Sequence, residues 1–183
     1  MSWTRACFVV LILTSSVLVT APDALAGGSV RCLGEAVTIV GTGGDDVITG
    51  TRGPDVIRAK LGDDTVRSLR GGDVICGERG DDILLGGSSI GQDLISGGPG
   101  RDELRGGTGS DLLIGGFGND VLRGLSGREL LRGGVGWDEL VGGRGRDRFQ
   151  GARGRDSCDF RAVDPPGMQE RDVYEMSCEI ITS

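Results

Sequence analysis

An acidic side chain recurs every nine residues, with one interval of eleven, through most of this 183-residue chain. The position holds Glu129 once and aspartate at twelve other places: Asp46, Asp55, Asp64, Asp73, Asp82, Asp93, Asp102, Asp111, Asp120, Asp138, Asp147 and Asp156. If the units stack at the spacing of β-strands, like charges about 5 Å apart repel by about 1 to 3 kcal/mol at an intermediate dielectric constant. Such a column of carboxylates needs cations, so the chemistry it indicates is metal binding.

The surrounding residue types favour calcium over other metals. Carboxylate and turn-carbonyl oxygens are hard ligands, and Ca²⁺ accepts about six to eight of them in irregular geometry, whereas Mg²⁺ demands a stricter octahedron. Zinc lacks its usual ligands, because the chain has no histidine and its cysteines lie far apart. The alternative that each aspartate only caps a turn is weaker, because no turn demands aspartate in twelve units of thirteen.

The acidic residue is the sixth of a nine-residue unit, GGxGxDxUx, in which U is apolar. Thirteen units fill residues 41–159, and two extra residues lengthen the unit at 86–96. The fourth position is always glycine, which indicates a turn that needs positive φ. We expect a three-residue strand at positions seven to nine, with the eighth side chain buried when the units stack. The residues at position eight are Ile48, Ile57, Val66, Ile75, Leu84, Ile95, Leu104, Leu113, Leu122, Leu131, Leu140 and Phe149.

Through these thirteen units the chain resembles the RTX, or hemolysin-type, calcium-binding nonapeptide family. The resemblance implies an all-β fold, a parallel β-roll that is a right-handed two-sheet solenoid with two nonapeptides in each coil. It also implies several Ca²⁺ ions between the turns of units i and i+2, held by turn carbonyls and by the twelve sixth-position aspartates. Six pairs of odd-numbered units and five of even-numbered units give at most eleven sites.

Some units depart from the family pattern, and we expect their turns to hold calcium weakly. The first or second glycine is replaced, for example, at Thr42, Thr51 and Leu125, and four units carry arginine at position five. Glu129 is left out of the expected ligands because its longer side chain misplaces the carboxylate oxygens.

Composition narrows the class of protein further. Glycine accounts for 36 residues and aromatic residues for 4%, which excludes a core of large interdigitating side chains. A formal charge of −7, with acids at regular intervals, disfavours a nucleic-acid partner, and the interleaved arginines indicate charge balancing. The absence of histidine excludes a His-based triad, so we expect no enzyme; glycan chemistry by paired carboxylates stays the alternative.

The ends of the chain predict export. Residues 1–26 have the features of a secretory signal peptide: Arg5, a mostly apolar run, and small residues at an AxA site. The apolar run is too short to span a bilayer, so we expect no transmembrane anchor. The mature protein is therefore expected to be secreted and extracellular.

Two caps are expected to flank the calcium-binding β-roll at 41–159. Residues 27–40 form the N-terminal cap, in which Ile39 takes a core position and Val37 the place of aspartate. Residues 160–183 form the C-terminal cap, where alternating apolar residues predict one half-buried strand that closes the roll.

Four cysteines remain after removal of the signal peptide, and an oxidising compartment favours two disulfides. Cys158 holds an inward position of the last unit, so we favour its pairing with Cys178, which leaves Cys32 with Cys76. Four cysteines also permit two other pairings.

The function expected from the sequence is that of a secreted calcium-binding β-roll that folds when calcium binds. The alternative is calcium-dependent adhesion to a cell surface or self-association. It rests on an outward-facing apolar ladder at position seven of even-numbered units, for which aliphatic stacking is the simpler explanation. The ladder consists of Val56, Val74, Leu94, Leu112 and Leu130.

Overall fold

The computed structural model describes residues 31–88, 90–159, 173–174 and 178–180, which form two parallel sheets of eight strands each and one small hairpin. Sheet 1 contains β3 (Ile39–Val40), β5 (Val56–Leu61), β7 (Val74–Arg79), β9 (Leu94–Pro99), β11 (Leu112–Phe117), β13 (Leu130–Gly136), β15 (Arg148–Gly154) and β17 (Val173–Tyr174). Sheet 2 contains β4 (Val47–Thr49), β6 (Thr65–Arg67), β8 (Ile83–Ser88), β10 (Glu103–Gly109), β12 (Val121–Gly127), β14 (Glu139–Gly145), β16 (Asp156–Asp159) and β18 (Cys178–Ile180).

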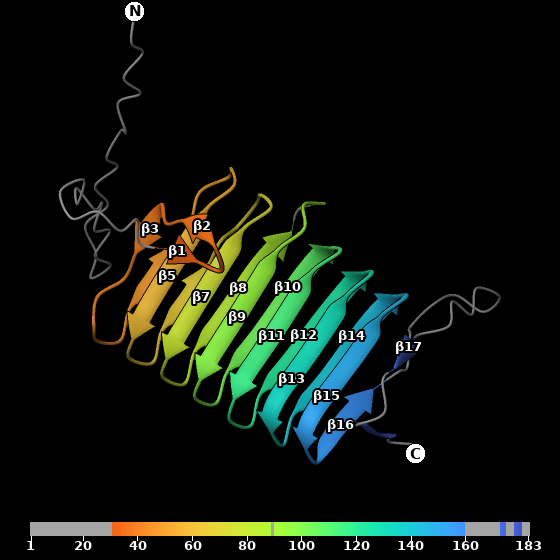
Figure 1. Ribbon diagram of the computed structural model, residues 1–183. Helices are drawn as coiled ribbons and strands as arrows, with labels where there is room; N and C mark the ends of the chain where they lie inside the picture. Colours follow the sequence, from red (N-terminus) through yellow and green to blue (C-terminus); the bar gives the residue numbers. More distant parts are fainter. Residues whose placement is uncertain (1–30, 89, 160–172, 175–177, 181–183) are drawn as a thin grey trace, which may run out of the picture.

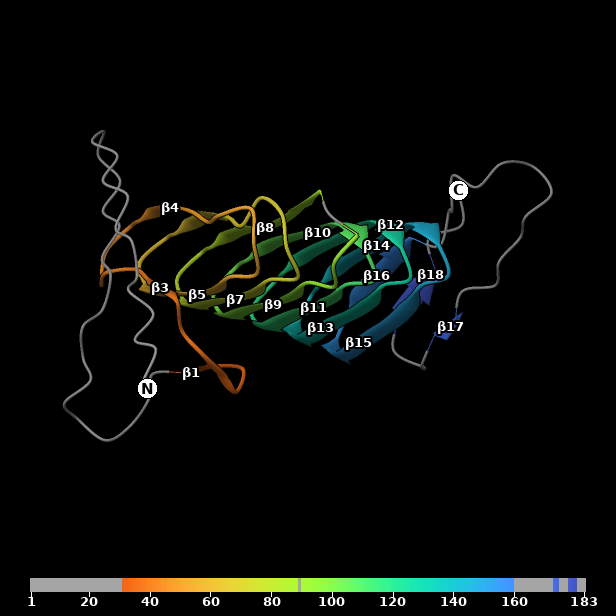
Figure 2. The same cartoon turned by 90° about the horizontal axis from the view of Figure 1, so that it is seen from above.

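The chain alternates between the two sheets, and two nonapeptides make one coil. Leu104 pairs with Leu122, and Leu113 with Leu131, each eighteen residues further along the chain. Figure 1 shows the strands side by side along the long axis of the molecule, and Figure 2 shows the two sheets facing each other. The predicted all-β parallel β-roll is confirmed.

Most strands are longer than the three residues expected at positions seven to nine. β11, for example, continues through positions one to three of the next unit, where Gly116 pairs with Gly134 and Phe117 with Val135. The reason is that identical units stack in register, so the backbone of the glycine positions also meets a partner in the coil above. Only β4 and β6, near the N-terminal end of sheet 2, keep the expected length.

The eighth position supplies the core, as predicted. All twelve apolar side chains at this position are at most 4% exposed, and Ile39 and Cys158 extend the same cluster toward the two ends. Because parallel register places equivalent residues side by side, these side chains form one row on each sheet, and the two rows meet between the sheets in a single cluster. The core is therefore one side chain wide on each sheet.

The two extra residues of the unit at 86–96 are confined to a turn between β8 and β9. Across this insertion the register rises from eighteen to twenty residues, as Ile75 pairs with Ile95 and Leu84 with Leu104. Ile90 in the turn is 97% exposed. The insertion thus projects from the roll and leaves the stack of strands intact.

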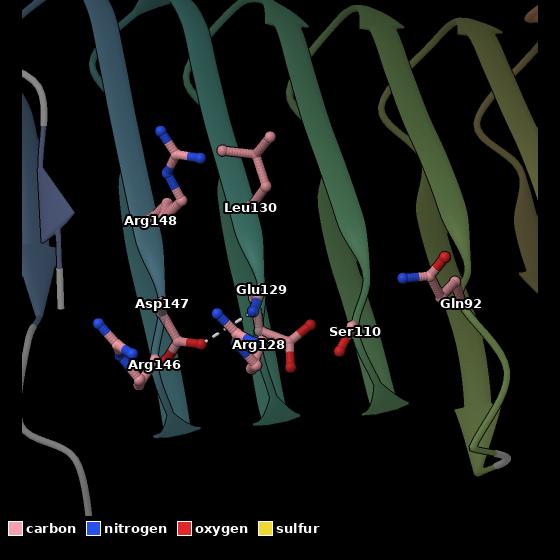
Figure 3. Close-up of a pocket in the computed structure, with 8 residues that line it drawn as sticks. All are labelled: Gln92, Ser110, Arg128, Glu129, Leu130, Arg146, Asp147 and Arg148. Atoms are coloured by element: carbon pink, nitrogen blue, oxygen red, sulfur yellow. Dashed lines mark hydrogen bonds between the residues drawn. The ribbon is translucent and has the colours of Figure 1, made fainter. Parts of the chain in front are cut away.

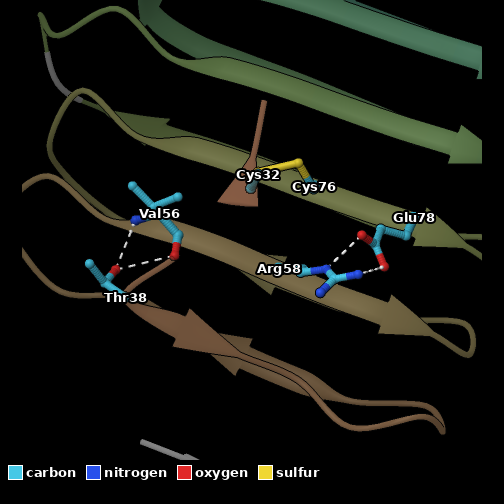
Figure 4. The surroundings of a disulfide bond; sticks show 6 residues. All are labelled: Cys32, Thr38, Val56, Arg58, Cys76 and Glu78. Atoms are coloured by element: carbon cyan, nitrogen blue, oxygen red, sulfur yellow. Dashed lines mark hydrogen bonds and ion pairs between the residues drawn. A yellow bond between two sulfur atoms is a disulfide. The ribbon is translucent and has the colours of Figure 1, made fainter. Parts of the chain in front are cut away.

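The N-terminal cap is a hairpin attached to the outside of sheet 1. β1 (Arg31–Cys32) pairs with β2 (Glu35–Ala36) in antiparallel fashion, and the disulfide between Cys32 and Cys76 ties the hairpin to β7 (Figure 4). β3 then begins sheet 1, with Ile39 in the core position expected for it.

The C-terminal cap differs from the single strand that was predicted. The segment contributes two short strands, β17 and β18, which pair with β15 in sheet 1 and β16 in sheet 2. Each sheet thereby gains its own terminal strand, because both sheets end in an open edge that needs a partner. The predicted disulfide between Cys158 and Cys178 joins β16 to β18.

The apolar ladder lies on sheet 1, where its residues are partners in successive strands from Val56 through Leu130. Each is half-buried by its neighbours. Among the described side chains, the most exposed aromatic residues are not part of the ladder: Phe117 is at the end of β11 and Trp137 is in the turn before β14. Among the described residues, no helix is long and apolar enough to cross a membrane.

Candidate metal centre

The sixth-position residues lie in the turns that join the sheets, and these turns form two rows. The first turn row leads from sheet 1 to sheet 2, and the second turn row leads back. The first row carries Asp46, Asp64, Asp82, Asp102, Asp120, Asp138 and Asp156. The second row carries Asp55, Asp73, Asp93, Asp111, Glu129 and Asp147. All except Asp46 are at most 5% exposed, so the roll gathers the predicted site residues into two buried columns.

A repeated hydrogen bond fixes each carboxylate in its column. The backbone N–H of the sixth residue in one unit donates to a carboxylate oxygen of the sixth residue one coil later, at 2.7 to 3.1 Å. Asp102 donates in this way to Asp120, and Glu129 to Asp147 (Figure 3). Eleven such bonds join the same eleven pairs of units that the sequence suggested as ion sites.

The second oxygen of most of these carboxylates is buried and has no hydrogen-bond partner. This is true of Oδ2 in Asp64, Asp73, Asp82, Asp102, Asp111, Asp120, Asp138 and Asp156, and of Oε1 in Glu129. An unpaired buried carboxylate oxygen costs several kcal/mol unless something compensates it. A repeated ligand, bound once per turn, is the compensation that this pattern indicates.

Where the first residue of a unit is glycine, as it is in all units except those that begin at Ala59 and Ser68, it leaves room beside that oxygen. A Cβ on Gly115 would lie within 3 Å of Asp120 Oδ2 and of the Gly133 carbonyl oxygen, and a Cβ on Gly86 would meet Asp93 Oδ2 and the Gly106 carbonyl in the same way. Carboxylate and carbonyl oxygens of neighbouring coils thus converge where a side chain is absent. This all-oxygen donor set suits a hard cation such as Ca²⁺.

A family model of the RTX calcium-binding nonapeptide repeat, which describes four copies of the unit, matches residues 40–75, 61–92, 88–122, 96–131 and 132–162. Together these matches cover more than half of the chain. The chain belongs to the RTX calcium-binding nonapeptide repeat family. No curated protein and no solved structure matches it.

RTX repeats are calcium-binding units, and the columns of this chain fit that chemistry. Within the described residues, no three acidic, histidine or cysteine side chains gather around one point. An ion between two turns of this RTX roll therefore has to draw part of its coordination from backbone carbonyls, as the glycine positions allow.

Units that lack the second RTX glycine nevertheless keep the RTX turn. Lys60, Leu69, Glu78, Leu125 and Ala152 all have φ between 77° and 95°, the left-handed region that glycine occupies in the other units. Each costs about 1 kcal/mol or more relative to glycine. The stacked neighbours hold the backbone in place, so these substitutions do not alter the path of the turn.

The first two units are different, because threonine replaces the second glycine. Thr42 donates its backbone N–H to Asp46 Oδ2 at 2.6 Å, and its hydroxyl is within hydrogen-bond distance of both carboxylate oxygens. Thr51 binds Asp55 in the same way. Among the described residues, no bond from the N–H of a preceding sixth-position residue reaches Asp46 or Asp55, so the threonine N–H and hydroxyl take over that role at the N-terminal end of the columns.

Glu129 keeps the hydrogen bond of the column but moves its second oxygen. Its Oε2 accepts the Asp111 N–H at 2.7 Å, as an aspartate would. The additional methylene puts Cγ, instead of a carboxylate oxygen, against the first glycine of the unit, Gly124, and Oε1 lies beside Gly127. The carboxylate oxygen is thus displaced from the position that the aspartates share.

Burial raises the pKa of ten of the carboxyl groups in the columns. Desolvation, opposed by the backbone hydrogen bond and reinforced by neighbouring carboxylates, raises the pKa of Asp64 and Asp120 to about 6, of Asp93 and Asp102 to about 7, and of Glu129 to about 8. Burial also raises the pKa of Asp73, Asp82, Asp111, Asp138 and Asp156. Without a cation, Asp93, Asp102 and Glu129 of the folded chain therefore bind protons near neutral pH.

Acid is therefore expected to stabilise the metal-free roll. Because the folded chain has the higher pKa values, it binds protons more tightly than the unfolded chain. The stability of the metal-free roll is present below the ordinary aspartate value of 3.8 and is lost as pH rises through about 6 to 8. Circular dichroism in calcium-depleted buffer should show strand content increasing from weakly alkaline to acidic pH. A strand content independent of pH would contradict this assignment.

A further column of side chains, at position five of the first turn row, was not identified from the sequence. At position five of the first turn row, Asp45 accepts the N–H of Asp63, and Asp63 accepts that of Asp81, at 2.8 to 2.9 Å. The Asn119 side-chain oxygen likewise accepts the backbone N–H of Trp137. The sequence does show aspartate or asparagine at this position in several alternate units, but the sixth position beside it holds an acidic residue in every unit and is the more regular pattern. These side chains are exposed, so they stabilise the turns without the desolvation seen in the buried columns.

Proposed function

We propose that this chain is a secreted, non-catalytic protein that binds several calcium ions through its twelve sixth-position aspartates and folds when it binds them. The observation that carries the proposal is the repeated pair of a buried, unpartnered carboxylate oxygen and a nearby turn carbonyl. Isolated units bury one apolar side chain each, so the roll depends on whatever neutralises the columns.

Each ion would be bound by oxygen atoms from two successive coils. The sixth-position aspartates of units i and i+2 supply carboxylate oxygens, and the turn carbonyls supply neutral oxygens. Bound calcium supplies the positive charge that lets these carboxylates stay ionised inside the roll. The hydrogen bond from the backbone N–H orients each carboxylate beforehand, because it leaves the second oxygen directed into the turn.

The proposed protein has four parts. Residues 1–26 are the signal peptide, 27–40 the N-terminal cap, 41–159 the calcium-binding roll and 160–183 the C-terminal cap. The two disulfides, one at each end of the roll, support an oxidising destination such as the extracellular space. Extracellular calcium reaches millimolar concentration, which is where repeated weak oxygen sites become occupied.

Substitution Asp111→Ala is expected to weaken calcium binding more than Glu129→Ala, by a factor on the order of ten. Both changes remove a carboxylate that accepts one backbone N–H in the same turn row. Only Asp111 has its second oxygen in the position shared by the columns. Calorimetric titration with calcium measures the difference.

Asp45→Ala is the matched control for this comparison. It also removes a carboxylate that accepts a backbone N–H from the next coil, but an exposed one at position five. Calcium affinity close to that of the unsubstituted protein is expected. Equal losses in all three variants would show that the assigned ligand roles are wrong.

The apolar ladder of sheet 1 supports a second candidate function, calcium-dependent self-association or binding to a cell surface. Its residues run continuously in register through β5, β7, β9, β11 and β13. The substitution of Leu94 and Leu112 by Thr keeps β-propensity and removes outward apolar area. If the ladder is an interface, sedimentation should show calcium-dependent association that the double variant loses. A monomeric calcium-loaded protein at high concentration, without binding to cells or glycans, would refute this candidate.

A further inference from the structure

A groove of about 330 Å³ opens on the second turn row near the C-terminal end of the roll (Figure 3). Its charged walls come from the turns before β13 and β15, which carry Arg128 and Arg146, and from Arg148 at the start of β15. Ser110 and Gln92 line the groove from the two preceding coils. The groove is thus lined mainly by turn residues and extends across four successive coils of one turn row.

The three arginines replace uncharged residues at two positions of the repeat, position five of the second turn row and position seven of sheet 1. Position five of the second turn row is uncharged in its first four units and becomes arginine in the last two: Pro54, Gly72, Gln92, Ser110, Arg128 and Arg146. Arg148 likewise ends the apolar ladder, pairing with Leu130 in the adjacent strand. Three positive charges therefore gather at one place in a chain whose formal net charge is −7.

These three arginines are exposed and take no part in the ion pairs found within the described residues. Those pairs involve Arg58, Arg105 and Arg123, which lie on the outer faces of the sheets. The two carboxylates in the groove are buried and accept backbone hydrogen bonds: Glu129 from the Asp111 N–H, and Asp147 from the Glu129 N–H. The guanidinium groups at the mouth of the groove are therefore available to a ligand.

The geometry suits a tetrahedral oxyanion. Arg128 and Arg146 occupy equivalent positions one coil apart, so their backbones are separated by about the 4.8 Å spacing of neighbouring strands. Figure 3 shows these two side chains on neighbouring coils, with the Asp147 side chain between them in this view and Arg148 further along β15 beside Leu130. A guanidinium donates through a planar fork, and a carboxylate ligand offers one such edge, whereas a phosphate monoester offers three terminal oxygens and about two negative charges.

We propose that this groove is a binding site for a phosphate monoester of a small soluble molecule. Arg128 and Arg146 hold the phosphoryl oxygens from neighbouring coils, Arg148 adds positive charge from β15, and the Ser110 hydroxyl and Gln92 amide donate to the remaining acceptors. The volume, at the lower end of the range for small-molecule sites, accommodates the phosphate and a group about as large as glycerol or one sugar. This activity is additional to the binding of calcium.

Calorimetric titration of the calcium-loaded protein with glycerol 2-phosphate tests the proposal. Binding with one-to-one stoichiometry is expected, and the double variant Arg128→Gln/Arg146→Gln should bind at least about tenfold more weakly. Arg101→Gln is the matched control, because Arg101 also occupies position five but lies in the first turn row; its affinity should equal that of the unsubstituted protein. Circular dichroism of each variant in calcium verifies that the roll is folded.

Four results would overturn the proposal. The first is no saturable heat at millimolar glycerol 2-phosphate, and the second is the same affinity in the double variant as in the Arg101→Gln control. The third is equal competition by acetate at the same ionic strength, which would show a response to charge alone. Sedimentation with phosphatidylcholine vesicles that contain phosphatidic acid separates the two sources of a phosphate monoester; binding to the vesicles without binding of glycerol 2-phosphate also overturns it.

Discussion

Removal of calcium is expected to unfold most of the roll at neutral pH. Every sixth-position acidic side chain except Asp46 is buried, and without calcium these twelve side chains lose the positive charge that compensates them. The core contributes only one apolar side chain per nine residues, which is too little to offset a backbone entropy cost of about 1 to 2 kcal/mol per residue. Circular dichroism of residues 27–183 with both disulfides intact should show a largely disordered chain in chelator and strand signal after millimolar calcium is added. Small-angle scattering should show compaction at the same calcium concentration.

Magnesium at equal concentration is the control for this experiment. It has the same charge as calcium but demands a stricter geometry, so it should restore much less strand signal. A chain that is equally folded in excess chelator would refute the proposal that calcium drives folding. Equal folding by both ions would refute the assignment of calcium selectivity to the turn oxygens.

Substitution Gly118→Ala is expected to lower the stability of the calcium-loaded protein by about 3 kcal/mol. Gly118 has φ 131°, and a Cβ there would overlap the carbonyl oxygen of Gly100 in the preceding coil. The obstruction is backbone, which cannot rotate away as a side chain does. Urea unfolding at saturating calcium measures the loss, which is a large part of the total for a domain of this size.

Gly44→Ala provides the matched control. Gly44 is the same fourth position in the first unit, where no atom lies within 4 Å of an added Cβ and φ is outside the left-handed region. Stability within about 0.5 kcal/mol of the unsubstituted protein is expected. If Gly118→Ala were equally harmless, the stacked carbonyls would not be what requires glycine at this position.

The repeat pattern predicted the core and the columns, and the family resemblance implied the coil of two nonapeptides. Leu113 and Leu122 are buried on opposite sheets, and Asp111 and Asp120 lie in opposite turn rows, because two nonapeptides make one coil and equivalent residues stack on the same side every eighteen residues. In a solenoid each unit contacts mainly its neighbours, so a pattern local in sequence already specifies the contacts in space. The disulfide between Cys158 and Cys178 could be anticipated for the same reason, since an inward position fixes which partner a cysteine can reach.

The tertiary structure decided what depends on the exact atoms of adjacent coils. Only the stacked turns show that the carboxylate of Asp120 accepts the N–H of Asp102, that Thr42 substitutes for the missing donor at Asp46, and that the additional methylene of Glu129 moves one oxygen. The split of the C-terminal cap into β17 and β18 likewise follows from two open sheet edges, which one alternating segment did not reveal. The period of the sequence specifies which residues become neighbours. The direction of each hydrogen bond, and the placement of Arg128, Arg146 and Arg148 around one groove, depend on how each coil stacks on the coil eighteen residues earlier.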